Sequence, residues 1–377
     1  MNASTEAVDN THAQMRSIIG RIATGPELSK DISLEEARFG MSALLNGEVD
    51  PVQGTIFLIA LRMKRETDDE NRGVLDAIRD ATIRATAEVD DVLDLADPYD
   101  GYNRTVPSSP FLPAVLAACG VPTVTHGLES VGPKYGATHR TILRAAGINV
   151  DVSPQQAAAS LSDAEAGWAY VDQARFCPKL HDLIDFRTTM VKRPAITTVE
   201  VMAGPVVGRK RTHLLTGYVH KPYPRIYAML ARHAGYDSSL LVRGTEGGVV
   251  PSLRQTGKFF SYREMGPESD FDVDPKALGI EQELRSLPLP EDVPEVIAGP
   301  ANELTLKDMN VASKLAAEYG LDALAGKPGG TRDGLVFTGG VTLWHMGKAD
   351  SAEDGAAKIR EALDSGRALA HFNAVKA

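Results

Sequence analysis

The residues best suited to chemistry are gathered in one short segment, residues 126–136. It holds His126, Glu129 and Lys134 among three glycines and one proline. The segment follows an apolar run, residues 121–124, that is typical of a buried strand, and it precedes a helix-like stretch, residues 138–146. A strand, a glycine-broken loop and a helix start can form an anion site, because backbone N–H groups and the helix dipole face the ligand. The alternative is an ordinary surface loop, since glycine is common wherever φ must be positive.

A second group of cations follows another predicted strand, residues 214–219. His220, Lys221 and Arg225 lie there among two tyrosines and two prolines, and Arg243 follows the next predicted strand. Loops at the carboxyl ends of parallel strands are where α/β proteins bind ligands. Arginine can hold a phosphate or carboxylate through two parallel hydrogen bonds.

We therefore expect one basic pocket for a small anionic, phosphorylated ligand, with two acidic members. Its expected members are His126, Lys134, His220, Lys221, Arg225 and Arg243, with Glu129 and Asp100 as the acids. His126, Glu129 and His220 are the candidates for proton transfer.

Each of these candidates also has a structural explanation. His126 can be a core histidine bonded to the backbone, and His220 with Lys221 can be a solvated turn. Glu129 can simply pair with a neighbouring cation, and Asp100 can be the first residue of an Asx turn.

Composition limits the class of protein. The 377 residues include 40 basic and 50 acidic side chains, for a formal net charge of −10, which disfavours nonspecific nucleic-acid binding. The two cysteines, Cys119 and Cys177, have no metal-like spacing and fit a reducing compartment. No secretory signal and no membrane-length apolar run are visible, so we predict a cytoplasmic protein that does not bind membranes.

Three helix starts organise the beginning of the chain. Ser33 with Glu36 and Thr67 with Glu70 predict capping boxes, and Asp50 before a proline predicts a third N-cap. We therefore predict a helical bundle domain over residues 1–91, with helices of the second domain returning to it.

Residues 92–377 alternate short apolar runs with helix-like segments, which predicts an α/β domain with a mostly parallel central sheet. The runs taken as strands are residues 121–124, 148–152, 169–171, 214–219, 240–242 and 334–337. A capped helix is expected from Ser153, a final helix over residues 352–369, and an irregular excursion or β-ribbon over residues 260–300.

The chain resembles the anthranilate phosphoribosyltransferase family, which belongs with the pyrimidine-nucleoside phosphorylases. The resemblance lies in residues 46–53 (NGEVDPVQ), 57–67 (FLIALRMKRET), 147–157 (GINVDVSPQQA) and 359–369 (IREALDSGRAL). It implies a helical domain plus an α/β domain with the ligand in the cleft between them, and a homodimer formed through the helical domain.

Three catalytic motifs of that family are altered here. The glycine-rich phosphate loop Gly-Thr-Gly-Gly-Asp-Gly corresponds to residues 96–101, where only Asp100 and Gly101 survive. The motif Lys-His-Gly-Asn-Arg-Ser corresponds to residues 125–130. The Asp-Glu pair that holds Mg²⁺ is replaced by Val249 and Val250, and valine offers no oxygen ligand.

The resemblance also implies a set of substrate-binding positions. They are Asp100, Gly101, Ser108, Gly127 and Ser130, with Arg187 on the side of the acceptor. To these this chain adds Arg104 and Lys134 as nearby cations, and Arg193 as a second arginine beside Arg187. The three altered motifs predict changed chemistry, with Mg²⁺ as the one cofactor that the family would bring and weak or no dependence on it.

The sequence therefore predicts a phosphoribosyltransferase-like pentosyltransferase. The alternative is a ligand- or nucleic-acid-binding protein that kept the fold and lost the reaction, and the net charge argues against the nucleic-acid version.

Overall fold

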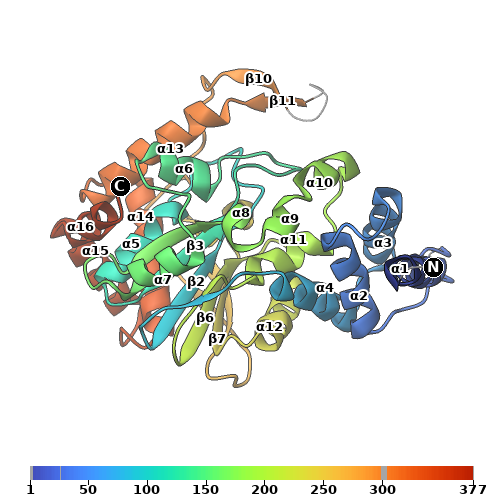
Figure 1. Ribbon diagram of the computed structural model, residues 1–377. Coiled ribbons are helices and arrows are strands. Elements are labelled where there is room, and N and C mark those ends of the chain that lie inside the picture. Colours follow the sequence, from blue (N-terminus) through green and yellow to red (C-terminus); the bar gives the residue numbers. More distant parts are fainter. Residues whose placement is uncertain (1–2, 26, 299–303, 377) are drawn as a thin grey trace.

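The computed structural model describes residues 3–25, 27–298 and 304–376, and Figure 1 shows its arrangement. Helices of the N-terminal region lie at one side of the molecule. A twisted sheet, covered by helices on both faces, forms the rest (Figure 1). This is the predicted fold class, a helical domain followed by a larger α/β domain.

The N-terminal helices begin where the sequence places their caps. They are α1 (Ala3–Ile22), α2 (Leu34–Leu45), α3 (Pro51–Lys64) and α4 (Asp68–Asp80). Ser33 with Glu36 and Thr67 with Glu70 form complete capping boxes, and the Asp50 carboxylate accepts from the backbone N–H of Val52. These local hydrogen bonds satisfy helix N–H groups that have no partner within the helix. The long first helix, α1, was not predicted.

Seven strands form the central sheet in the order β4-β3-β2-β6-β7-β8-β9. They are β2 (Asp91–Ala96), β3 (Thr123–Gly127), β4 (Trp168–Asp172), β6 (Arg211–Gly217), β7 (Ser238–Val242), β8 (Gly257–Tyr262) and β9 (Ser269–Val273). The first five in this order are parallel, and β8 and β9 are antiparallel. The carboxyl ends of β2, β3, β6 and β7 therefore lie at one edge of the sheet.

The strands alternate their side chains between two cores. Val92 and Ala96 pack with the N-terminal helices and α12, whereas Leu93 and Leu95 pack with α5 and the C-terminal helices. A central parallel sheet buried on both faces is typical of this fold class.

The other helices complete these two layers. They are α5 (Leu112–Ala118), α6 (His139–Ala145), α7 (Pro154–Ser162), α8 (Gln173–Phe176), α9 (Pro178–His181), α10 (Ile184–Met190), α11 (Ala195–Val199), α12 (Tyr223–His233), α13 (Met309–Leu324), α14 (Gly330–His345), α15 (Ala352–Asp364) and α16 (Arg367–Ala374). Short 3₁₀ turns are η1 (Ser109–Phe111), η2 (Glu200–Met202), η3 (Thr245–Gly247) and η4 (Pro275–Leu278). Helix α11 packs against α3 and α4, so the helical layer includes a segment from later in the chain.

Two predicted strands are wrong. Residues 334–337 lie inside the sixteen-residue helix α14, and residues 148–152 form a loop with a single isolated bridge from Ile148 to Lys376. Short apolar runs do not distinguish a strand from a buried helix turn, because both hide every side chain. The predicted final helix is also two helices, α15 and α16, separated by Gly366 in the left-handed conformation.

Residues 260–300, expected to be an irregular excursion or a β-ribbon, contain both irregular stretches and strands. Strand β9 and the turn η4 lie within this segment. A hairpin of β10 (Glu295–Ala298) and β11 (Leu304–Lys307) projects at its end (Figure 1). Residues 299 and 300 of this prediction lie outside the described residues. A small parallel pair, β1 (Ala85–Thr86) with β5 (Val206–Val207), completes the strands described.

Within the described ranges, no helix has both the length and the apolar character that crossing a membrane requires. Cys119 and Cys177 are both free thiols.

His345 is buried near the amino ends of the parallel strands, beside Ser238 of β7, and makes the free energy of unfolding depend on pH. Burial and the nearby charge of Arg263 lower the pKa of His345 from 6.5 to about 3. Between these values the unfolded chain binds more protons here than the folded chain, so the free energy of unfolding falls as pH falls. We expect a slope of about 1.4 kcal/mol per pH unit below the unfolded pKa. Urea unfolding between about pH 5 and pH 7 should show this slope reduced in His345→Gln, and equal slopes in both chains would contradict the assignment.

Candidate functional site

A cleft of about 190 Å³ lies where the carboxyl edge of the sheet meets the helical layer. Its walls come from the loops after β2, β3, β6 and β7, and from helices α3, α11 and α12. The lining residues that carry charge or an aromatic or imidazole ring are Arg62, Tyr99, Asp100, Lys134, Arg193, Tyr218, His220, Tyr223, Tyr227 and Glu246. This position is the one at which parallel α/β sheets bind ligands.

One buried carboxylate and two cations form the polar centre of the cleft. Asp100 Oδ1 lies 3.0 Å from Lys134 Nζ, and Asp100 Oδ2 accepts a hydrogen bond from the Arg193 guanidinium. The Asp100 side chain is 6% exposed, whereas that of Arg193 is 46% exposed. Lys134 Nζ also donates to the backbone carbonyl of Glu246 at 3.1 Å, which ties the loop after β3 to the loop after β7.

Aromatic rings form one wall of the cleft. The rings of Tyr223 and Tyr227 on α12 meet edge to face with centroids 5.6 Å apart, and the His220 ring lies 6.2 Å from Tyr223. Such a wall can pack against a flat or apolar part of a ligand.

The helical layer contributes Arg62, from α3, beside Tyr223. Partial burial lowers the pKa of Arg62, but its contacts with Tyr223 and Glu66 outweigh burial, so the net shift is upward. The guanidinium therefore stays charged at the mouth of the cleft.

Close backbone approaches shape the floor of the cleft. A Cβ at Gly248 would lie 1.7 Å from the Tyr102 hydroxyl oxygen, and one at Gly217 would lie 2.2 Å from the carbonyl oxygen of Gly247. Only glycine fits where these loops meet.

Beneath this floor lies a buried carboxylate, Asp97. It accepts hydrogen bonds from Tyr102 at 2.6 Å, His139 Nε2 at 2.8 Å, the Val249 backbone N–H at 3.0 Å and the Ser109 hydroxyl. Burial raises the pKa of Asp97, but His139, Ser109 and Tyr102 together outweigh burial, and the net shift is downward. The carboxylate therefore stays charged and joins the loops after β2 and β7 to α6.

Of the residues that the sequence pointed to, the structure brings Asp100, Lys134, Arg193 and His220 to the cleft. The rest are not among the residues that line it, and their contacts explain why.

His126 lies in the core at the end of β3. Its Nε2 is 2.7 Å from Asp94 Oδ1, and its Nδ1 bonds the Tyr99 hydroxyl. The other Asp94 oxygen accepts from Tyr236 at 2.6 Å. Both ring nitrogens are thus engaged by side chains, and His126 is buried, which favours a core histidine, although its partners are side chains and not the backbone.

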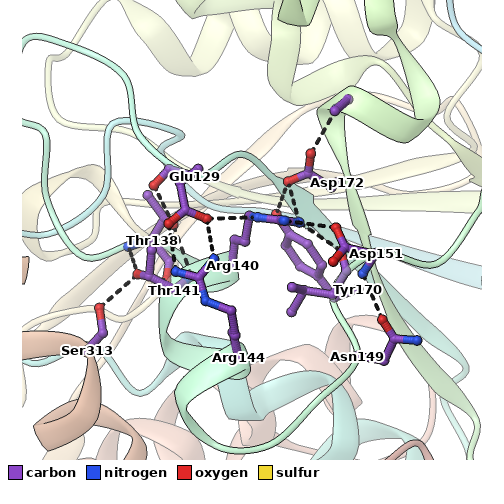
Figure 2. A network of polar contacts seen from close by, with 12 residues as sticks. Glu129, Thr138, Arg140, Thr141, Arg144, Asn149, Asp151, Tyr170, Asp172 and Ser313 are labelled. Carbon is purple, nitrogen blue, oxygen red and sulfur yellow. Dashed lines mark hydrogen bonds and ion pairs between the residues drawn. The ribbon is translucent and has the colours of Figure 1, made fainter. Parts of the chain in front are cut away.

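Glu129 is held at the surface by two arginines, as Figure 2 shows. Arg144 donates to both carboxylate oxygens at 2.6 Å, and Arg140 Nε donates at 2.9 Å. Arg140 also pairs with Asp151 and Asp172. Partial burial raises the pKa of Glu129, but Arg144 and Arg140 outweigh it and the net shift is downward. A carboxylate stabilised in this way is a weak proton acceptor, so the pairing explanation holds.

The helix that follows this loop is capped by two threonines. Helix α6 begins at His139, and Thr138 with Thr141 forms a capping box that uses the backbone N–H groups of these two residues. The cation that the segment brings to the cleft is Lys134.

Arg187 pairs with Glu200 inside the protein. Its two terminal nitrogens donate to the Glu200 oxygens at 2.8 and 2.7 Å, and both residues are buried. The arginine is therefore already occupied and does not face an acceptor in the cleft.

The remaining cations point elsewhere. Arg225 pairs with Asp68 at 2.8 Å on the exposed side of α12, and Lys221 and Arg243 are exposed outside the cleft lining. Arg104 contributes its backbone N–H near the cleft, donating to Glu246 at 3.1 Å.

The small residues of the prediction have structural places. Gly101 adopts φ +71, and a Cβ there would lie 2.6 Å from the carbonyl oxygen of Ala137. Ser108 lines a separate cavity of about 20 Å³, Gly127 is buried at the end of β3, and Ser130 is half-buried in the following loop.

The residues at the altered metal motif do not fit Mg²⁺. Val249 is buried, and its backbone N–H is used by Asp97. Across the described ranges, no group of three or more His, Cys, Asp or Glu side chains is arranged to hold a metal ion.

The sequence did not point to Arg62 or to the tyrosine wall as parts of the site. These residues come from segments far apart in the chain, and no local motif links them. A weak signal was the place of Arg62 within residues 57–67, one of the stretches that carry the resemblance.

Comparison with known proteins agrees with this architecture. The family model "Glycosyl transferase family, helical bundle domain" matches residues 16–82, and "Glycosyl transferase family, a/b domain" matches residues 100–287. An uncharacterized protein of Aquifex aeolicus is 29% identical over 88% of this chain and 93% of its own. An anthranilate phosphoribosyltransferase of Nitrobacter hamburgensis is 27% identical over 94% of this chain and 96% of its own.

Solved structures share the fold. Anthranilate phosphoribosyltransferase from Thermus thermophilus has a TM-score of 0.73 at 20% identity, covering 96% of this chain and 98% of its own. The Saccharomyces cerevisiae enzyme in complex with PRPP and Mg has a TM-score of 0.72 at 15% identity, covering 97% of both chains.

Proposed function

The chain belongs to the glycosyl transferase family with a helical bundle domain and an a/b domain, and we propose that it binds a small phosphorylated ligand as a phosphoribosyltransferase-like pentosyltransferase. The observation that carries this proposal is the cleft itself, where Lys134, Arg193 and Arg62 converge at the carboxyl edge of the sheet.

In this proposal the cations hold the phosphate or pyrophosphate group on the ribose C1 carbon of a sugar phosphate, and the tyrosine wall receives the acceptor. The C1–O bond breaks, phosphate or pyrophosphate leaves, and the acceptor forms the new bond to C1. Charge on an oxocarbenium-like ribose carbon would build up during transfer, and positioning and fixed charges would supply most of the rate acceleration. Because the residues at positions 249 and 250 do not fit Mg²⁺, we propose binding without the metal. The proposal does not extend to the anthranilate reaction itself.

Replacing Lys134 provides the direct test. Lys134→Ala should weaken binding of ribose 5-phosphate by about 1.5–3 kcal/mol, the range for hydrogen bonds to charged groups. The matched control is Lys327→Ala, because Lys327 pairs with Asp322 at the surface and does not line the cleft. Calorimetric titration measures both variants. Equal affinity of the Lys134 variant and the unmodified chain for ribose 5-phosphate would contradict binding of the ligand in this cleft.

A binding protein without turnover is the second candidate function. It is favoured by one observation: His126 and Glu129 are bound to structural partners. Neither side chain is therefore free to transfer a proton in the cleft. Consumption of a bound sugar phosphate in the presence of an acceptor separates the two candidates.

We also propose a homodimer formed through the helical layer. It would cover Val52 and Met63 on α3, whose exposed fractions are 65% and 76%. Sedimentation velocity measures the mass directly, and a monomer at micromolar concentration would contradict this proposal.

A further inference from the structure

Asp100 occupies the place in the cleft where an anion would be expected. We propose that the Asp100 carboxylate is an internal counter-ion, and that the phosphate monoester group of the ligand binds by displacing it from Lys134 and Arg193. This inference rests on the proposed function, because it assumes that the cleft takes an anionic ligand.

The geometry of the three side chains supports displacement. Each oxygen of Asp100 contacts a different cation, with Lys134 Nζ at 3.0 Å and the Arg193 guanidinium on the other side. An anion bridging two cations in this way is the arrangement that a phosphate oxygen pair would adopt. The Asp100 side chain lines the cleft and is almost fully buried.

The backbone around Asp100 is fixed independently of the carboxylate. Its carbonyl accepts from the Gly136 N–H at 2.9 Å, and the Gly101 N–H donates to Pro98 at 3.0 Å. Lys134 keeps its second bond, to the carbonyl of Glu246. These bonds do not involve the carboxylate, so its displacement would leave them in place.

Charge balance singles out Asp100. The other described carboxylate that lines the cleft, Glu246, accepts from the backbone N–H groups of Asn103 and Arg104 and from the Thr105 hydroxyl. It neutralises no cation of the cleft through these bonds. Displacing Asp100 would release two positive charges together, which suits a doubly charged phosphate monoester.

Asp100→Asn tests the inference. The amide has nearly the same size but no charge, so Lys134 and Arg193 would be free for the ligand. We expect ribose 5-phosphate, titrated calorimetrically at constant ionic strength without added metal, to bind about tenfold more tightly. Asp68→Asn is the matched control, because Asp68 also pairs with an arginine, Arg225, but outside the cleft. Its affinity should equal that of the unmodified chain.

A second variant keeps the test independent of how Asp100→Asn folds. Arg193→Gln changes a side chain that is nearly half exposed, and the inference predicts about tenfold weaker binding of ribose 5-phosphate. Thermal unfolding checks the fold of both variants.

The outcomes separate this inference from the proposed function. Tighter binding in Asp100→Asn with weaker binding in Arg193→Gln supports it. If the unmodified chain binds ribose 5-phosphate and Asp100→Asn binds it equally or more weakly, the displacement is overturned, but the proposed function stands. Absence of binding in every chain at millimolar ribose 5-phosphate overturns both.

Discussion

Replacing Arg187 by leucine is expected to lower the free energy of unfolding by about 3–5 kcal/mol, the cost of leaving one partner of a buried ion pair alone. Glu200 is 1% exposed, and without the guanidinium its carboxylate is left with the side-chain donor of Gln173 at 3.3 Å. Urea unfolding at neutral pH, followed by tryptophan fluorescence, measures the loss.

Two controls show whether burial causes this effect. Arg225→Leu breaks an exposed pair with Asp68 and should cost less than about 1 kcal/mol. Replacing Arg187 and Glu200 together by leucine removes both charges and should recover most of the stability lost by the single variant. A loss below about 1 kcal/mol in Arg187→Leu would show that Glu200 finds another partner or water.

Replacing Asp97 by alanine is expected to have a comparable effect, about 3–5 kcal/mol, because it removes a buried charge and leaves its donors without an acceptor. The donors are Tyr102 and Ser109 in the connection between β2 and α5, His139 in α6, and the Val249 backbone after β7, which are three separate segments. We therefore expect the loop that carries Glu246 and Gly247 into the cleft to become more mobile, in addition to the global loss in the free energy of unfolding.

Hydrogen exchange identifies the local part of this effect. The Val249 amide should exchange faster in Asp97→Ala than in the unmodified chain, and urea unfolding should give the global loss. Asp97→Asn keeps an oxygen for the Val249 N–H and should cost about 1–3 kcal/mol. Asp322→Ala, which breaks an exposed pair with Lys327, is the matched control. Unchanged Val249 exchange in Asp97→Ala would contradict this role for the carboxylate.

The sequence predicted best what is decided locally. The capping boxes at Ser33 and Thr67 are present because a side chain and a backbone N–H three residues apart need no other partner. The family resemblance predicted the two-part fold. The apolar run at residues 334–337 was misassigned because burial inside α14 hides the helical period from a short window.

The site was harder to predict because its contacts are long-range. Residues such as His126 and Arg187 have chemically useful side chains, and the sequence does not show that Asp94 and Glu200 bind them. Lys134 was predicted because it lies in the loop after a predicted strand, and Asp100 because it survives from the family's glycine-rich phosphate loop. Arg62 and Tyr223 meet because the tertiary fold brings both to one cleft, which no spacing in the chain encodes.

Calorimetric titration with phosphoribosyl pyrophosphate, with and without Mg²⁺, tests the central claim most directly. We predict binding without the metal, an affinity that Mg²⁺ does not strengthen, and a loss of affinity in Lys134→Ala. Binding that requires Mg²⁺ would mean that the chain holds the metal through groups other than Val249 and Val250 and keeps the family's chemistry. Absence of binding under both conditions would contradict the proposed phosphorylated ligand.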